Sequence, residues 1–140
     1  MKKIVLISCA SKKLNHKAKA KDLYIGPLFK LSLEYARLLK PDYIFILSAK
    51  HGLVDLEKEL EPYNLTLNTM KANQIKIWAE SVLEQLKSKV DLKSDDVIFL
   101  AGNKYRKYLI PFILHYQIPL RGLKIGKQLQ YLKRGINDAK

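Results

Sequence analysis

The chain has 140 residues, a length typical of one domain, and 48% of them are hydrophobic, which is enough for a core and excludes wholesale disorder. Its net charge of +13 favours an anionic partner such as nucleic acid, a nucleotide or an acidic surface, although a lysine-rich surface that only maintains solubility also fits. A lone cysteine, Cys9, excludes an intrachain disulfide, and no apolar run reaches the ~18 residues of a membrane span, so we expect a cytoplasmic protein without membrane association.

The first third of the chain predicts two buried strands joined by a helix. Residues 3–10 (KIVLISCA) and 42–49 (DYIFILSA) are continuous apolar runs, the pattern of strands covered on both faces in a parallel sheet. Residues 11–22 form a polar loop with five lysines, and residues 27–40 predict a helix that starts at Pro27. The apolar positions of this helix are Leu28, Leu31, Tyr35, Leu38 and Leu39.

The rest of the chain continues the alternation. Residues 50–70 form a long connection, which we expect to be irregular with a short helical turn, and connections of this length are often functional. The following elements are a helix over residues 73–90, a strand over 95–102, a helix over 103–117, a short strand over 118–123 and a helix over 125–138. The helix over 103–117 is expected to be capped by Asn103 and bent near Pro111.

Strands that alternate with helices are typical of α/β domains with a mostly parallel sheet. We therefore predict a single domain over residues 1–140, a three-layer sandwich with a mostly parallel four-stranded sheet and helices on both faces.

Small hydroxyl or amide residues beside a cation follow three of the predicted strands. Ligands of open parallel sheets bind beyond the carboxyl ends of the strands, where the strand order switches. We therefore expect the three loops to form one site for a phosphate- or nucleotide-sized anion, aided by the helix that opens at Gly102 and Asn103. The residues are Ser8, Cys9, Ser11, Lys12 and Lys13 after the first strand, Ser48, Lys50, His51 and Gly52 after the second, and Gly102, Asn103, Lys104, Tyr105 and Arg106 after the third.

Three of these residues are candidates for catalysis. His51 lies on a turn where neighbouring lysines favour its neutral form, so it could donate or accept a proton, or it could simply bond to the backbone. Cys9 is either a nucleophile activated by nearby cations or a small residue that lines the site, and Lys50 either contacts a phosphate or is solvated. An enzyme of this kind requires Cys9, Lys50 and His51 to share one concave pocket.

The loops supply further candidates for substrate binding. Gly52 is expected to adopt a backbone conformation closed to other residues. Glu61 offers a carboxylate, and Tyr63 and Tyr24 offer rings that either stack on a base or anchor the loops by packing. The lysine-rich residues 12–21 either track a nucleic-acid backbone or form a solvated loop. No P-loop, GxSxG or HExxH motif and no zinc-ligand spacing is present, so we predict no metal and no cofactor.

Six segments in this order, ISCASKK, AKDLYIGPLF, ILSAKHGLV, EPYNLTL, LAGNKY and GLKIGKQLQYLK, resemble an uncharacterised microbial and phage family. That family has a CSxxK-type first loop, an LSAKHGL turn, a PYd-L segment and a closing GLxIGxQLxWL helix. More distantly, the first loop and the turn are similar to the archaeosine synthase core domain and the YaaA peroxide-stress proteins, which are related to the uracil-DNA-glycosylase-like α/β fold. The resemblance implies a domain that handles nucleobases, nucleotides or nucleic acid, with candidate residues Cys9, Ser11, Lys12, Ser48, Lys50, His51, Gly52 and Tyr63.

The sequence departs from these relatives at three points. The Thr-Lys-Pro-Tyr continuation of archaeosine-synthase-like proteins is replaced by KKLN, and the water-activating Asp motif of glycosylases is missing after the first strand. Tyr131 stands where the family usually has tryptophan. Hydrolysis of a base–sugar bond by the uracil-glycosylase route is therefore not supported.

Two functions are open at this point. The first is an enzyme acting on a nucleobase, a nucleotide or a nucleic-acid base, with Lys12 and Lys50 on phosphate and His51 as acid, base or stabiliser of negative charge. Tyr63 or Tyr24 would stack on the base. The second is a non-catalytic DNA- or RNA-binding protein of the stress or phage-related type, whose affinity falls steeply with salt. A partner protein or a homodimer is a further possibility.

Overall fold

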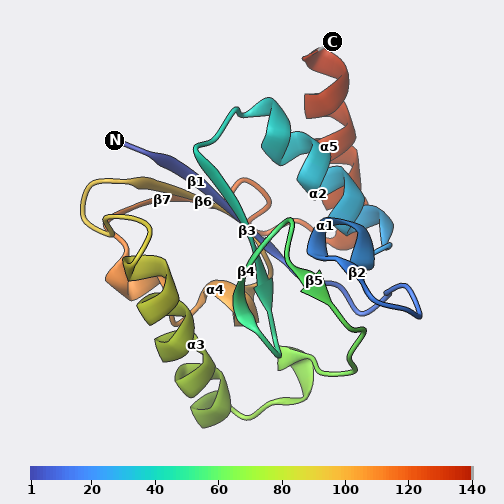
Figure 1. The fold of residues 1–140 in the computed structure, drawn as a ribbon. Coiled ribbons are helices and arrows are strands. Elements are labelled where there is room, and N and C mark those ends of the chain that lie inside the picture. The colour runs from blue at the N-terminus through green and yellow to red at the C-terminus, as the bar shows by residue number, and fades with distance from the viewer. Residues whose placement is uncertain (140) are drawn as a thin grey trace.

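The computed structural model describes residues 1–139 as an α/β fold in which helices cover both faces of a central sheet (Figure 1). In chain order the elements are β1 (Lys3–Ser8), β2 (Ala18–Lys19), α1 (Ala20–Leu23), α2 (Pro27–Leu38), β3 (Tyr43–Ser48), β4 (Gly52–Asp55), β5 (Glu59–Leu60), the 3₁₀ turn η1 (Leu67–Thr69), α3 (Ala72–Lys87), β6 (Asp96–Leu100), α4 (Asn103–Arg106), the 3₁₀ turn η2 (Ile110–Phe112), β7 (His115–Gln117) and α5 (Ile125–Asp138). Within these residues, no helix combines the length and apolar character needed to span a membrane.

The central sheet has five strands in the order β4-β3-β1-β6-β7. β1 pairs in parallel with β3 and β6, and β6 pairs in parallel with β7, whereas β4 folds back antiparallel to β3. In register, Leu6 of β1 lies between Phe45 of β3 and Phe99 of β6. The mostly parallel sheet with helices confirms the predicted α/β class, but the sheet has five strands rather than four.

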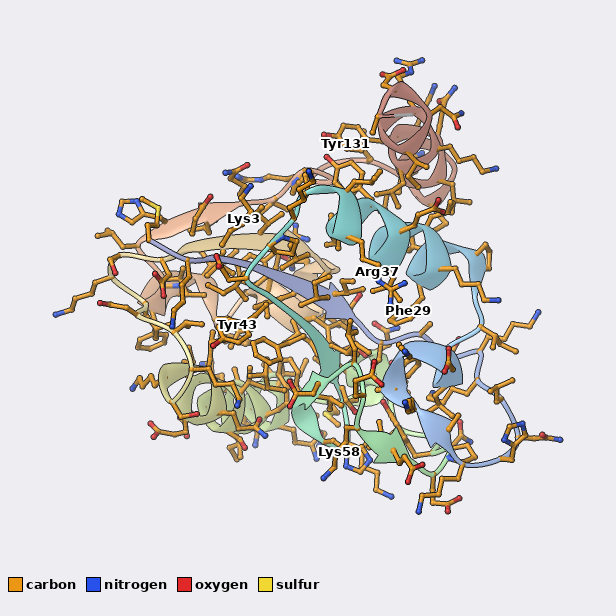
Figure 2. All side chains as sticks on the ribbon, turned by 45° about the horizontal axis from the view of Figure 1, so that its top comes forward. Lys3, Phe29, Arg37, Tyr43, Lys58 and Tyr131 are labelled. Atoms are coloured by element: carbon orange, nitrogen blue, oxygen red, sulfur yellow. The ribbon has the colours of Figure 1, made fainter. Side chains whose placement is uncertain are left out.

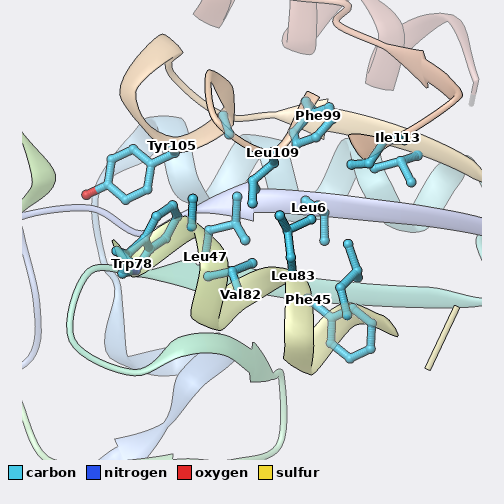
Figure 3. Packing of buried hydrophobic residues seen from close by; sticks show 14 of the residues in the cluster. Leu6, Phe45, Leu47, Trp78, Val82, Leu83, Phe99, Tyr105, Leu109 and Ile113 are labelled. Carbon is cyan, nitrogen blue, oxygen red and sulfur yellow. The ribbon is translucent and has the colours of Figure 1, made fainter. Parts of the chain in front are cut away.

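Each face of the sheet has its own hydrophobic cluster. On one face α3 and the α4–η2 segment pack against the sheet, and Figure 3 shows Trp78 and Val82 of α3 in the same cluster as Leu109 and Leu6. On the other face α2 and α5 lie side by side (Figure 1) and bury Phe29 and Leu132. The three central strands are continuous apolar runs because both of their faces are covered.

The predicted helix over residues 103–117 begins at Asn103 as expected but is far too long, and the predicted strand over 118–123 is wrong. The helix ends after one turn, and Pro111, which lacks a backbone N–H, lies in η2. The chain then extends and forms β7, whose His115 lies in register with Asp96 on the free edge of β6. Asn103 is not a side-chain cap, because the N-cap position belongs to Gly102.

The long connection over residues 50–70 is more ordered than predicted. It supplies β4, which extends the sheet, and β5, which pairs antiparallel with β2 in a separate two-stranded sheet. Lys19 and Lys21 each form an ion pair with Glu57 at 2.9 Å. This pairing orders part of the lysine-rich residues 12–21, so a wholly solvated loop is the wrong description.

The buried face of α2 is displaced from the predicted positions. Phe29, Ser32, Leu33 and Ala36 are buried, whereas Leu38 is 41% exposed. Small side chains such as Ser32 and Ala36 let the helix lie close to the sheet, and the larger predicted residues pack along the border of this face. The predicted residues that pack only partly are Leu28, Leu31, Tyr35 and Leu39.

Candidate functional site

The strand order creates a crevice at the carboxyl ends of β1 and β6. From β1 the chain continues to β3 on one side of it, whereas from β6 the chain continues to β7 on the other side. Connections that leave neighbouring strands in opposite directions open the crevice in which α/β proteins bind ligands. Two cavities, of about 80 and about 100 Å³, lie at this place and share Cys9 and Ala10 in their walls.

The first cavity, which we name the β1/β6 cavity, lies between the ends of these two strands and the helices α2 and α5. Its polar groups come from Ser8, Cys9, Ser32, Gly102, Arg106 and Gln128, and the remaining lining residues are apolar. The full lining is Ser8, Cys9, Ala10, Leu28, Phe29, Ser32, Leu100, Ala101, Gly102, Arg106, Leu120 and Gln128.

Arg106 is the cation of the β1/β6 cavity. Its Nη1 donates to the carbonyl of Ala101 at 2.7 Å, which directs the half-buried guanidinium across the end of β6. Partial burial lowers the pKa of Arg106, and the like charge of Arg121 lowers it further. Within residues 1–139, no carboxylate forms an ion pair with this guanidinium. Arg106 therefore keeps donors available for an anionic ligand.

The second cavity, the Tyr105 cavity, lies on the α3 side and is lined by Cys9, Ala10, Ser11, Leu65, Thr66, Asn68 and Tyr105. The Tyr105 ring meets Trp78 edge-on, with centroids 5.7 Å apart, and Figure 3 shows its hydroxyl pointing away from the core. That hydroxyl lies 3.4 Å from the Sγ of Cys9. Burial and the neighbouring Cys9 raise the pKa of Tyr105, so it is a neutral hydrogen-bonding group near pH 7.

Cys9 stands between the two cavities. Its backbone N–H donates to the carbonyl of Leu47 at 3.0 Å, which extends the pairing of β1 with β3 by one residue. The side chain is a free thiol of intermediate exposure. A group in either cavity can therefore approach the sulfur, and the hydroxyl of Tyr105 is placed to orient it.

A chain of hydroxyl groups links the first two strand-end loops to the long connection. The hydroxyl of Tyr63 lies 2.6 Å from that of Tyr24 and 2.7 Å from Ser48 Oγ. Ser48 Oγ also accepts the backbone N–H of His51 at 3.1 Å. Burial raises the pKa of Tyr24 to about 12, and burial also raises the pKa of Tyr63. These groups are neutral near pH 7, and Tyr24 and Tyr63 anchor the loops by packing.

Lys13 lies over the same tyrosines. Its Nζ is 4.5 Å from the ring centroid of Tyr63 and 5.7 Å from that of Tyr24, in the geometry of a cation–π contact. Desolvation lowers the pKa of Lys13, while the neighbouring Cys9 opposes that shift. The faces of these rings toward Lys13 are therefore occupied by its ammonium rather than open to a base.

His51 and Lys50 are exposed and line neither cavity. The His51 ring contacts Tyr63 edge-on, with centroids 5.5 Å apart. Partial burial lowers the pKa of His51, and Lys50 and Lys58 lower it further, so the imidazole is neutral near pH 7. The structure does not bring Cys9, Lys50 and His51 into one concave pocket. Tyr63 is the link between His51 and the other strand-end residues.

The remaining predicted residues divide between the cavities and the surface. Gly102 lines the β1/β6 cavity and Ser11 lines the Tyr105 cavity. Lys12, Glu61 and Asn103 are exposed and line neither cavity. The helix that begins at Asn103 has four residues, too short to provide the anion-binding terminus expected from the sequence.

The chain matches a "Family of unknown function (DUF6884)" over residues 4–134. It belongs to this family. It is also 28% identical over 149 positions to "Uncharacterized protein YfjM" of Bacillus subtilis (strain 168), an alignment that covers 99% of this chain and 97% of that protein. Membership of an uncharacterised family is thereby confirmed. The family motifs and the more distant similarities remain predictions.

Sequence reasoning missed several of the cavity residues of this family member. Ser32 and Gln128 reach the β1/β6 cavity from the two outer helices, and Thr66 and Asn68 reach the Tyr105 cavity from the long connection. One signal was present for Ser32, which is a polar residue on the buried face of an amphipathic helix. The other three residues lie in segments whose periodicity does not mark them.

Gly52 has a structural role at the turn after β3. Its φ is +73°, and a Cβ there would collide with the amide oxygen of Gln85, which accepts the Leu53 N–H at 2.8 Å. We expect Gly52→Ala to lower the free energy of unfolding by about 2–3 kcal/mol, measured by urea denaturation. Gly122→Ala is the control, because Gly122 has a φ of +78° but a Cβ there would meet no atom of the described residues within 4 Å. It should cost about 1 kcal/mol, and equal costs for the two variants would show that the Gln85 contact is irrelevant.

Proposed function

We propose that the protein binds a nucleotide, or another ligand that carries a nucleobase and an anion, in the β1/β6 cavity. The observation that carries this proposal is the guanidinium of Arg106, which lines a cavity at the carboxyl ends of β1 and β6 and forms no ion pair within residues 1–139. A site of that chemistry at the switch in strand order is typical of nucleotide-binding α/β domains.

We propose further that the domain is of the uracil-DNA-glycosylase-like kind, a relationship supported by the mostly parallel sheet with helices on both faces.

The lining of the cavity suits one part of such a ligand. Arg106 can donate two parallel hydrogen bonds to a phosphate or to two acceptor atoms on the edge of a base. The hydroxyl of Ser32 and the amide of Gln128 can complement the polar edge of a base, while Phe29 provides an apolar wall. At about 80 Å³ the cavity accommodates one such group, with the rest of the ligand at its mouth.

Cys9 is the side chain best placed to react with a ligand held there. Its thiol borders the cavity and lies 3.4 Å from the hydroxyl of Tyr105, which can donate to a thiolate. His51 remains our candidate acid or base, acting from the outer side of Tyr63, and Lys50 our candidate phosphate contact. Both assignments require a ligand that extends from the cavity across the tyrosines.

Arg106→Met is the direct test of this site. We expect nucleoside monophosphates to bind the native protein, measured by isothermal titration calorimetry, and the variant to bind about ten- to a hundredfold more weakly because a charge-assisted pair is lost. Bound nucleotide should also slow the alkylation of Cys9 by iodoacetamide in the native protein and not in the variant.

Lys107→Met provides the matched control. It removes the same charge from the next residue, which is exposed and lines neither cavity. Circular dichroism and thermal unfolding establish that both variants are folded. Equal nucleotide affinity in the native protein and the Arg106 variant, or alkylation that is indifferent to nucleotide, would contradict the proposed site.

The second candidate function is non-catalytic binding of DNA or RNA, which the net charge of +13 favours. Such binding depends on a continuous basic face rather than on a cavity. A protein that binds strands with a steep salt dependence, but binds no mononucleotide and is indifferent to Arg106→Met, would support this function over the first.

A further inference from the structure

The positive charge of the chain is concentrated in its last third. Residues 97–137 contain eight lysines and arginines and no aspartate or glutamate, so they carry +8 of the net +13. Five of the eight fall between Arg121 and Arg134, in the approach to α5 and in α5 itself. Because the segment contains no acidic residue that could neutralise its lysines and arginines, its positive charge can attract an anionic ligand.

The fold does not use these charges to stabilise α5. Lys124 is the N-cap residue and Lys127 lies in the first turn, where no acidic residue is present. Cations at this end are unfavourable, because the helix dipole is positive there. Lys127 donates only to the neutral amide of Gln130, at 3.4 Å, and the ion pairs within residues 1–139 involve other lysines. Among residues 1–139, the basic residues of α5 form no ion pair, so their charges can be neutralised by an external anion.

One side of α5 carries a groove of about 310 Å³ that is lined by Leu123, Lys127, Gln130, Tyr131 and Arg134. Tyr131 is 41% exposed and meets Tyr35 of α2 with ring centroids 6.0 Å apart, and Figure 2 shows it above α2. The groove thus holds an aromatic ring between two cations. Lys127 and Arg134 are seven helical residues apart, which corresponds to a rise of about 10 Å.

This groove, which we name the α5 groove, adjoins the β1/β6 cavity. Gln128, which lines the cavity, donates from Nε2 to the carbonyl of Leu123, which lines the groove, at 2.8 Å. Arg121 lies on the same approach and is close enough to Arg106 to lower its pKa. Basic side chains therefore extend from the cavity mouth onto α5.

We propose that the α5 groove binds single-stranded nucleic acid, with Lys127 and Arg134 on phosphates and Tyr131 stacked on a base, so that one nucleotide of the strand enters the β1/β6 cavity. The proposal rests on the proposed function of that cavity and specifies its ligand as a residue within a strand. A ring flanked by cations is the usual platform for single strands, because every base has a face to stack. In a duplex those faces are already covered by neighbouring bases.

The test uses a fluorescein-labelled oligonucleotide of about 12 residues, as DNA, as RNA and as a duplex, with binding followed by fluorescence anisotropy over a range of salt concentrations. We expect at least one single strand to bind more than tenfold tighter than both the duplex and a nucleoside monophosphate. The double variant Lys127→Gln/Arg134→Gln should bind at least tenfold more weakly. Its slope of log affinity against log salt should be shallower by about 1.4, since each lost phosphate contact removes about 0.7.

Variants of Tyr131 distinguish the contribution of base stacking to binding from the contribution of charge. Tyr131→Leu should weaken single-strand binding about tenfold without changing the salt slope, and Tyr131→Phe, which keeps the ring, should bind as the native protein does. The DNA and RNA arms identify which strand is preferred. Equal binding of a base-free polyanion such as polyphosphate would overturn the proposal, because it would leave no role for the ring.

Lys89→Gln/Lys93→Gln is the control for net charge. Both lysines are exposed and precede the amino end of β6, whereas the cavity lies at the carboxyl end of that strand. Equal losses in the two double variants would overturn the α5 groove as the binding surface. Mononucleotide binding that depends on Arg106, without tighter binding of any strand, would overturn this inference and leave the cavity site intact. Binding of neither ligand would overturn both proposals.

Discussion

Replacing Trp78 with alanine is expected to lower the free energy of unfolding by about 3–5 kcal/mol, the usual cost of removing a large buried aromatic side chain. Trp78 is 9% exposed on the inner face of α3. Domains of this size are stabilised by only about 5–15 kcal/mol, so the loss is a large share of the total. Urea denaturation followed by far-UV circular dichroism measures it without relying on tryptophan fluorescence.

Trp78 also couples the core to the candidate site. Its indole N–H donates to the carbonyl of Ser48 at 2.8 Å, and its ring supports Tyr105, whose hydroxyl lies beside Cys9. Trp78→Phe is the matched variant, because it keeps an aromatic ring but leaves the buried carbonyl without its donor. It should cost about 1–2 kcal/mol. In the alanine variant Cys9 should be alkylated faster than in the native protein, since Tyr105 loses its support.

A cost below about 1 kcal/mol for Trp78→Ala would show that the packing around α3 is loose enough to collapse into the space of the lost ring. An unchanged alkylation rate in a folded variant would show that Trp78 is not needed to hold Tyr105 beside Cys9. The packing around Trp78 would then have no effect on the reactivity of Cys9.

Elements with continuous apolar runs or a clear helical periodicity of apolar residues were predictable from the sequence. β1, β3 and β6 lie within the predicted runs because each is covered on both faces, and α5 spans Ile125–Asp138 as predicted. The predicted face of α3 is buried. Its residues are Ile75, Trp78, Val82 and Leu86, whereas Val90, predicted on the same helix, is buried beyond the end of α3 at Lys87.

Elements that depend on tertiary pairing were not predictable. All three residues of β7 are exposed, so no hydrophobic pattern marks this strand, and it forms because β6 offers a free edge beside it. β4 depends in the same way on β3 and on the left-handed conformation of Gly52. The local sequence pattern predicts which residues are buried, but it does not predict which strands pair, because the pairing strands lie far apart in the chain.

The candidate site shows the same division. The rule that ligands bind at strand ends pointed to Cys9 and Gly102 among other residues, and these two line the β1/β6 cavity. It could not separate these from His51 and Lys50, because the loop after β3 turns back into β4 and carries both residues away from the crevice between β1 and β6. It also could not reveal that Ser32 and Gln128 of the outer helices close that crevice.

Stability is expected to fall steeply as the pH rises above about 10, the ordinary pKa of tyrosine. Burial raises the pKa of Tyr24 to about 12 and raises those of Tyr63 and Tyr105 as well. Below pH 10 these phenols are protonated in both states and contribute no pH dependence. Above it the unfolded chain releases protons that the folded protein retains, so each such tyrosine lowers the free energy of unfolding by about 1.4 kcal/mol per pH unit.

Three tyrosines together give a slope of about 4 kcal/mol per pH unit, which persists until the folded state begins to ionise near the pKa of Tyr24, about 12. Urea denaturation between pH 8 and about 11 measures the slope directly.

Tyr63→Phe provides the matched comparison, because it removes one titrating phenol from the hydroxyl chain with Tyr24 and Ser48. Above pH 10 its slope should be shallower than the native slope by about 1.4 kcal/mol per pH unit. Lysines that lose charge in the same range are common to both proteins and cancel in this difference. Parallel slopes would mean that the Tyr63 phenol is as accessible to water when the protein is folded as when it is unfolded. The Tyr24–Tyr63–Ser48 chain would then not be the closed anchor that fixes the loops around the cavities.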